Sequence, residues 1–290
     1  MFYRPYCNLV IQWIQNLLES GIYKMEALNP IELIKKNPYA LASISNPTEE
    51  MQLIAVQKNG LLLEYIDNPT TTIQETALDN NAHAIKFIKS PTDSMMIKAV
   101  EAGWVNLQYL KAPTEEVIRL AIHQAGWAIK YVSNPSEELQ LLAVRNNYDA
   151  IKFIKAPSEN TQIEAVTINS EAIRLISSPS YKAELIAILH NEESIKFVDN
   201  NDKNRLLSFL KVNILILKYI KENITKDELE DTLRAVLSRE DVEEKYVRDF
   251  LNLSITDCTI INQIDKLSFI YQYGSKRAKK ITVDEKLKLL

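Results

Sequence analysis

The 290-residue sequence contains little glycine, cysteine or histidine, with five, two and three residues respectively. So few glycines leave little material for tight hairpins or phosphate-binding loops, and helix becomes the expected secondary structure. Cys7 and Cys258 lie near opposite ends of the chain, so a disulfide framework is not indicated and a reducing compartment is expected. Three histidines without paired cysteines or an HExxH motif do not indicate a metal site.

The sequence also lacks long hydrophobic runs, a strong net charge and the common catalytic motifs. The segment closest to a targeting signal, residues 7–18, is interrupted by Gln12, Gln15 and Asn16, so an amphipathic capping helix is expected there rather than a membrane span. The net charge of −4 does not indicate a global attraction to nucleic acid. Because no G-x-S-x-G, Walker or dinucleotide-binding motif occurs, we expect a non-enzymatic protein without a cofactor. The cysteine usage makes the cytoplasm the expected compartment.

What the sequence does contain is a repeat of 22 residues, marked by proline. The series comprises Pro47, Pro69, Pro91, Pro113, Pro135, Pro157 and Pro179. With the proline counted as position 0, position 1 is always Ser or Thr, position 8 is always Ala, and position 18 is aromatic in six of the seven copies. A spacing this regular indicates a repeat architecture.

Each repeat position has a physical role. We expect Asn or Ser before the proline to cap a first helix, with the proline in its first turn. Position 12 is mostly asparagine and is expected to end this helix in the left-handed conformation. A second, shorter helix is then expected to direct positions 15, 16, 18 and 19 inward, as in Ile151, Phe153 and Ile154.

Two short helices cannot bury a core alone, so neighbouring repeats must stack. The predicted fold is all-α: a right-handed α-solenoid of 22-residue two-helix repeats with N- and C-terminal caps. The predicted domains are an N-terminal helical cap with a degenerate repeat (1–46), eight repeats (47–222), a degenerate ninth repeat (223–248) and a C-terminal cap (249–290). The basic cluster Lys276–Lys280 is expected in a solvated tail segment, with nucleic-acid contact or an import signal as alternatives.

The segment NPSEELQLLAVRNNYDAIKFIK, residues 134–155, resembles a short repeat of bacterial, phage and large-DNA-virus proteins that is grouped as a domain of unknown function. More loosely, it is similar to the leucine-rich-repeat variants, which also have two short helices per unit. The resemblance covers about residues 47–222. It implies a helical solenoid of microbial or viral origin, in host cytoplasm in the viral case, and it carries no site residues.

Cations recur at positions 17 and 20 of the second helices. The members of this predicted basic track are Lys86, Lys89, Lys111, Lys130, Lys152, Lys155, Arg174 and Lys196. One interpretation is a surface for nucleic acid or an acidic protein. The other, which we favour, is charge complementarity at helix ends, including pairs such as Lys155 with Glu159. A repeat spacing of about 10 Å fits the phosphate spacing of a nucleic acid poorly.

Aromatic residues vary at positions 13 and 14, between the two helices. Four successive repeats carry His83, Trp104, Trp127 and Tyr148 there. Such residues anchor protein interfaces, although each ring could instead cover the loop of the neighbouring repeat. The sequence therefore predicts a protein–protein interaction scaffold, adaptor or inhibitor, with nucleic-acid binding as the alternative. An enzyme with a site outside the repeats and a self-assembling structural protein rank below these two.

Overall fold

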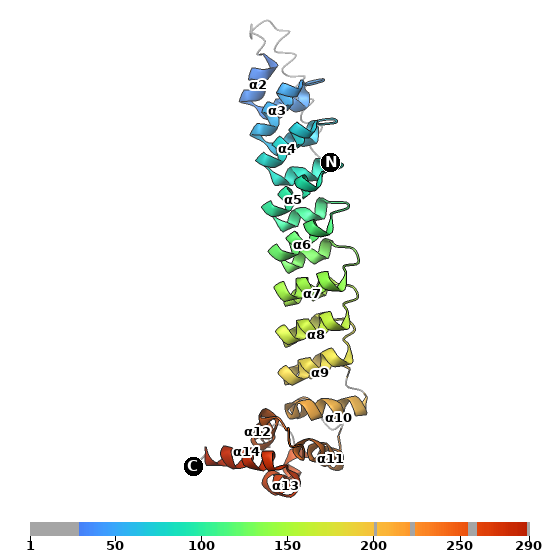
Figure 1. Ribbon diagram of the computed structural model, residues 1–290, viewed down its shortest axis with the longest axis vertical. Helices are drawn as coiled ribbons and strands as arrows, with labels where there is room; N and C mark the ends of the chain where they lie inside the picture. The colour runs from blue at the N-terminus through green and yellow to red at the C-terminus, as the bar shows by residue number, and fades with distance from the viewer. Residues whose placement is uncertain (1–28, 200–201, 221–223, 255–259, 289–290) are drawn as a thin grey trace, which may run out of the picture. The chain divides into compact units, whose positions relative to one another are not determined.

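The computed structural model describes residues 29–199, 202–220, 224–254 and 260–288, and within these ranges the secondary structure is helical, without strands (Figure 1). This confirms the predicted all-α class and the succession of paired helices; the handedness of the array stays a prediction. By their internal contacts, the residues form two compact units, 1–117 and 118–290. Each unit is described by itself.

Each repeat folds as an α-helix followed by a short 3₁₀ helix. The first unit contains α2 (Pro30–Lys36), η1 (Pro38–Ser43), α3 (Glu49–Lys58), η2 (Gly60–Tyr65), α4 (Thr71–Asn80), η3 (Ala82–Phe87), α5 (Asp93–Ala102) and η4 (Trp104–Tyr109). After α6 (Glu115–Gln124), which crosses the division, the second unit continues with η5 (Gly126–Tyr131), α7 (Glu137–Asn146), η6 (Tyr148–Phe153), α8 (Glu159–Ile168), η7 (Ser170–Leu175), α9 (Tyr181–His190) and η8 (Glu192–Phe197).

Neighbouring repeats stack within each unit, as a solenoid requires. In the first unit α3 packs against α4, and η2 packs against both η3 and α4. In the second unit α7, α8 and α9 contact one another in succession, and so do η5 to η8. The alanine at position 8 is fully buried in every repeat, for example Ala77 and Ala143 at 0% exposure. A small residue at this position allows the close approach between layers.

The first helices begin two residues later than predicted. The N-cap is the Ser or Thr at position 1: the Ser136 hydroxyl accepts from the Leu139 N–H at 3.4 Å, and Thr70 accepts from Ile73. The proline therefore precedes the cap, and the prediction that the residue before it is the N-cap is wrong for these repeats. That residue is disfavoured in the helical region by the proline ring, and Asn46, Asn68 and Asn134 adopt positive φ instead.

Position 12 is also corrected by the structure. Asn59 has φ −152° and ψ 104°, which is extended rather than left-handed. Its side-chain oxygen accepts from the Leu61 N–H at 3.1 Å, so this asparagine caps the start of the 3₁₀ helix. Gly103 and Ala125, which replace asparagine at this position, are extended too and make no side-chain cap bond.

The aromatic position 18 lies at the surface, which contradicts the predicted inward orientation. In η6, Ala150, Ile151 and Ile154 are buried, whereas Phe153 is 39% exposed. A 3₁₀ helix has three residues per turn, so positions 16 and 19 share the core face and positions 15 and 18 share the adjacent one, where the small Ala150 is covered but the larger ring of Phe153 reaches the surface. The α-helical spacing assumed from the sequence placed all four together.

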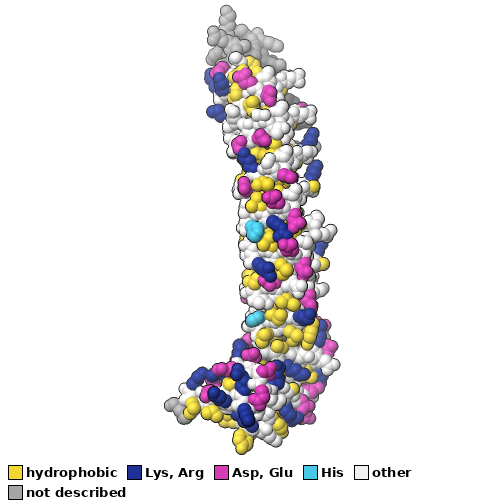
Figure 2. Space-filling model, viewed as in Figure 1, with side chains coloured by type: hydrophobic (Ala, Val, Ile, Leu, Met, Phe, Trp, Pro, Cys, Tyr) yellow, Lys and Arg dark blue, Asp and Glu magenta, His cyan; other side chains and the backbone are white. Residues whose placement is uncertain are grey.

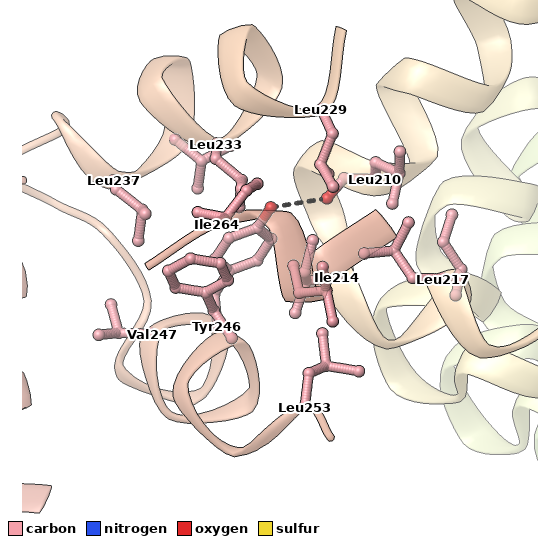
Figure 3. Packing of buried hydrophobic residues seen from close by; sticks show 14 of the residues in the cluster. Leu210, Ile214, Leu217, Leu229, Leu233, Leu237, Tyr246, Val247, Leu253 and Ile264 are labelled. Atoms are coloured by element: carbon pink, nitrogen blue, oxygen red, sulfur yellow. Dashed lines mark hydrogen bonds between the residues drawn. The ribbon is translucent and has the colours of Figure 1, made fainter. Parts of the chain in front are cut away.

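The second unit continues with one more pair of an α-helix and a 3₁₀ helix, α10 (Lys203–Val212) and η9 (Ile214–Lys218), at the place of the predicted eighth repeat. It then ends in a helical cluster of α11 (Lys226–Leu237), α12 (Glu244–Asn252), η10 (Ile260–Gln263), α13 (Lys266–Tyr273) and α14 (Lys276–Leu287). Tyr246 lies in its core, where its hydroxyl donates to the Leu210 carbonyl at 3.0 Å and burial raises its pKa (Figure 3). The surrounding residues include Ile214, Leu229 and Ile264. This cluster covers the apolar end of the last repeat.

The basic cluster Lys276–Lys280 forms the first turns of α14, in place of the expected tail segment. Ala278 is fully buried, and the Arg277 Nε–H donates to the Val242 carbonyl at 2.8 Å. Lys276 and Lys280 remain exposed. In the described ranges, no helix has the length and hydropathy needed to cross a membrane.

Candidate interaction surfaces

The cations of the predicted basic track all have exposed side chains and lie on the 3₁₀ helices or just after them. Three belong to the first unit (Lys86, Lys89 and Lys111) and five to the second (Lys130, Lys152, Lys155, Arg174 and Lys196). The two groups differ in their surroundings.

In the second unit, position-17 cations stack on position-18 rings. The Lys130 Nζ lies 4.6 Å from the Tyr131 ring centroid and 5.9 Å from that of Phe153 in the next repeat. Lys152 lies 5.1 Å from the Phe153 ring. We call this surface the cation–aromatic edge, and its further members are Arg174 on Phe197 at 5.1 Å and Lys196 on Tyr219 at 4.3 Å. Exposed contacts of this kind contribute about 0.5–1 kcal/mol each, which gives the repeated aromatic a structural role.

Carboxylates neutralise much of this edge. Lys152 pairs with Asp149 at 2.7 Å, and Lys196 pairs with Glu193 at 3.0 Å. Each acid occupies position 14 of its repeat and lies one turn before the lysine on the same 3₁₀ helix. Pairing reduces the positive potential available to phosphates, so the second unit offers a weak track for nucleic acid.

The predicted pair of Lys155 with Glu159 does not form. Glu159 instead pairs with Lys182 of the following repeat at 2.9 Å. Arg145 and Glu164 are joined in the same way at 2.7 Å. The ion pairs therefore tie successive first helices together, and being exposed they contribute little stability individually.

The four aromatic candidates do not form one cluster within either unit. The ring of His83, an exposed residue, lies 6.5 Å from that of Tyr109 in the next repeat, and Trp104 is half-buried. In the second unit the Trp127 Nε1–H donates to Asp149 in the next repeat at 2.7 Å, and Tyr148 is half-buried. His83 and Trp127 thus cover the neighbouring repeat, which was the alternative to a role as interface anchors. A role of the four residues in binding a partner stays a prediction.

Asp149 links Trp127 to the cation–aromatic edge. Burial acts to raise the pKa of Asp149, but hydrogen bonds from Lys152 and Trp127 outweigh it and lower the pKa. The carboxylate therefore stays charged and holds both donors in place. Asp149 thus joins one member of each residue set that the sequence suggested separately, Trp127 and Lys152.

An apolar surface on α8 and α9 was not predicted. Tyr181 is 42% exposed, Leu189 41% and Ile168 48%. Tyr181, Leu185 and Leu189 are spaced four residues apart on α9 and so share one face, with Ile168 at the end of the neighbouring α8. We call these four residues the α9 patch, and Figure 2 shows hydrophobic side chains gathered over α9.

The repeat itself contains the signal that could have revealed this patch. Position 10 is polar in the six preceding copies, namely Gln57, Asp79, Glu101, His123, Arg145 and Thr167, before it becomes Leu189. Position 2 is acidic or threonine in those copies and becomes Tyr181.

The described residues contain no group of three or more His, Cys, Asp or Glu side chains placed to hold a metal ion. His83, His123 and His190 are exposed and lie in different repeats. Cys7 and Cys258 lie outside the described residues.

No protein-family model, curated protein or solved structure matches the chain. The surfaces are therefore interpreted from their geometry and chemistry.

Proposed function

We propose that this protein is a non-enzymatic scaffold, adaptor or inhibitor that binds another protein through the α9 patch. The observation that carries the proposal is the replacement of polar residues by exposed Tyr181 and Leu189 on one helix face. Exposed large apolar residues that cluster on a soluble surface are typical of protein contacts, with aromatic residues as anchors. The partner segment is expected to present apolar side chains.

The chemistry of the patch favours a protein over a nucleic acid. Its four members carry no positive charge, and the adjacent Lys182 is paired with Glu159. Arg205 lies over the Tyr181 ring at 5.6 Å and is committed to Glu184. A surface without available cations has little attraction for phosphate groups.

Site-specific photo-crosslinking in the native host tests this proposal. A photoreactive residue at position 189 is expected to capture a distinct protein, and the same residue at position 57, the matched position 10 of the first unit, is not. Leu189→Glu should abolish the capture made from position 185, whereas Gln57→Glu should leave it intact. Crosslinks only between copies of this chain, or capture that survives Leu189→Glu, would overturn the proposal.

The alternative is nucleic-acid binding along the lysine track. Retention on RNA that is lost between about 50 and 300 mM salt would support it. Retention that depends on Lys130, Lys152 and Arg174 would place the nucleic acid on the second unit. The pairing of Lys152 with Asp149 makes this the less favoured candidate.

A further inference from the structure

A basic cleft lies in the first unit, on a different surface from the α9 patch. It has a volume of about 340 Å³ and is bounded by η3, the loop that follows it, and η4 with its own loop. Its charged lining residues are Lys86, Lys89 and Lys111, and no carboxylate lines it. We call it the lysine cleft.

The three lysines of the cleft have no carboxylate within ion-pair distance among the described residues, in contrast to Lys152 and Lys196 of the second unit. For Lys86, at position 17, the reason lies at position 14 of the same 3₁₀ helix. In the second unit this position supplies Asp149 and Glu193, whereas η3 carries His83 there. With the acid replaced, the positive charge of the cleft is left for a ligand.

The other walls of the cleft are aromatic and apolar. Tyr109 is 37% exposed, and Phe87 has the Lys86 Nζ over its ring at 4.6 Å. Met96 contributes where Gln52 and Gln74 stand in the two preceding repeats. Those glutamines each donate to a proline carbonyl of their own loop at 3.0 Å. Methionine can make no such bond and leaves an apolar wall.

No other pair of neighbouring repeats inside either unit combines such lysines with an aromatic and apolar wall. The preceding pair carries Glu64 and Asp67 at positions 17 and 20. In the second unit position 20 is Ser133, Ser177 or Asp199 in three of the copies. The lysine cleft is therefore a departure from the repeat and not a consequence of it.

We propose that the lysine cleft binds a nucleotide, with the phosphate held by Lys86, Lys89 and Lys111 and the base stacked on Tyr109. Lysine ammonium groups bind phosphate as point charges. An exposed aromatic ring is a stacking platform for any base. A volume of about 340 Å³ lies at the lower end of the range for small-ligand sites and suits one nucleotide, either free or within a single strand.

Titration calorimetry of the full chain tests the proposal with adenosine monophosphate, inorganic phosphate and a short single-stranded oligoribonucleotide. Adenosine monophosphate should bind at low salt and more tightly than phosphate. Lys89→Gln and Lys111→Gln should each weaken it about fivefold, the loss of about 1 kcal/mol of charge attraction. Tyr109→Leu should weaken the nucleotide and leave phosphate binding unchanged. Lys155→Gln, at position 20 of another repeat, is the matched control and should have no effect.

The two nucleotide sources are separated by the oligoribonucleotide. Tighter binding of the strand, still dependent on Lys89 and Lys111, assigns the cleft to single-stranded nucleic acid; equal affinity assigns it to a free nucleotide. The proposal is overturned by no binding at low salt, by equal affinity for phosphate and nucleotide, or by an unchanged affinity in Lys89→Gln and Lys111→Gln variants with wild-type thermal unfolding. A glutamate-rich peptide that binds as tightly as the strand also overturns it.

Discussion

The ion pair between Glu184 and Arg205 should respond very differently to removal of one partner or the other. Glu184 stands at position 5, where Gln140 and Gln162 occur in the two preceding repeats, and its side chain is only 3% exposed. Arg205, in the next repeat, retains 32% exposure. Burial raises the pKa of Glu184 above its ordinary value of 4.5 despite the neighbouring guanidinium, and the charge of Asp199 adds to the rise.

The asymmetry in burial determines the magnitudes. Arg205→Met leaves a buried carboxylate without its partner, which should cost about 3–5 kcal/mol of the free energy of unfolding at neutral pH. Glu184→Gln leaves an arginine that water can still solvate. The new amide can also donate to the Pro179 carbonyl, as Gln140 donates to Pro135 at 3.0 Å. A gain of about 1 kcal/mol from this bond would offset the lost ion pair, so Glu184→Gln should be close to neutral.

The dependence on pH follows from the direction of the Glu184 pKa shift. Because the pKa is raised in the folded state, that state binds more protons than the unfolded one at pH values between the two pKa values. The contribution of Glu184 to stability therefore falls as pH rises through this window and is constant above it. Removing Arg205 raises the pKa further, so the cost of Arg205→Met should shrink at a pH of about 5.

Urea denaturation of the four proteins in the double-mutant cycle, followed by circular dichroism at both pH values, measures these differences. Glu184→Gln combined with Arg205→Met should recover most of the stability lost in Arg205→Met alone. The reasoning is refuted if Glu184→Gln destabilises as strongly as Arg205→Met at neutral pH. It is also refuted if the cost of Arg205→Met is the same at both pH values.

Three further predictions concern the repeat scaffold, and thermal or urea unfolding measures each. Gly126→Ala should lower the free energy of unfolding by about 1–3 kcal/mol, because a Cβ there would lie 2.2 Å from a backbone carbonyl of the next repeat. Gly103→Ala, where a Cβ would meet nothing closer than 3.9 Å, should be nearly neutral. Equal costs for the two variants would contradict this explanation. Asn134 has φ 52°, so its replacement by alanine should lower the free energy of unfolding by about 1 kcal/mol, whereas replacement by glycine should lower it little. The reverse order would rule out strain of the left-handed backbone as the cause. Phe153→Ala should cost below about 1.5 kcal/mol and Ile151→Ala about 2–5 kcal/mol, since only the isoleucine is buried; a larger cost for the phenylalanine would mean that position 18 faces the core.

Rules that relate residues close together in the chain account for the features of the repeat that the sequence predicted correctly. The proline spacing, the invariant alanine at position 8 and the hydroxyl residue at position 1 predicted paired helices that stack, and the structure has this arrangement within each unit. The predicted caps lie two residues before the observed ones because Asn134 before the proline and Ser136 after it are both good cap residues. Only the backbone conformation distinguishes them, with Asn134 left-handed and Ser136 extended.

The sequence by itself determined the helical class, the length of the repeating unit and the exposed position of its lysines, since these follow from periodicity and charge along one chain. Tertiary structure decided which lysines are available. Lys152 meets Asp149 one turn away on a 3₁₀ helix, whereas Lys86, Lys89 and Lys111 converge on a cleft with no acid. It also decided that Phe153 faces outward and that Tyr181 and Leu189 form a surface with Ile168. Both outcomes depend on helix type and on contacts between neighbouring repeats, which a pattern of residue types along one chain does not specify.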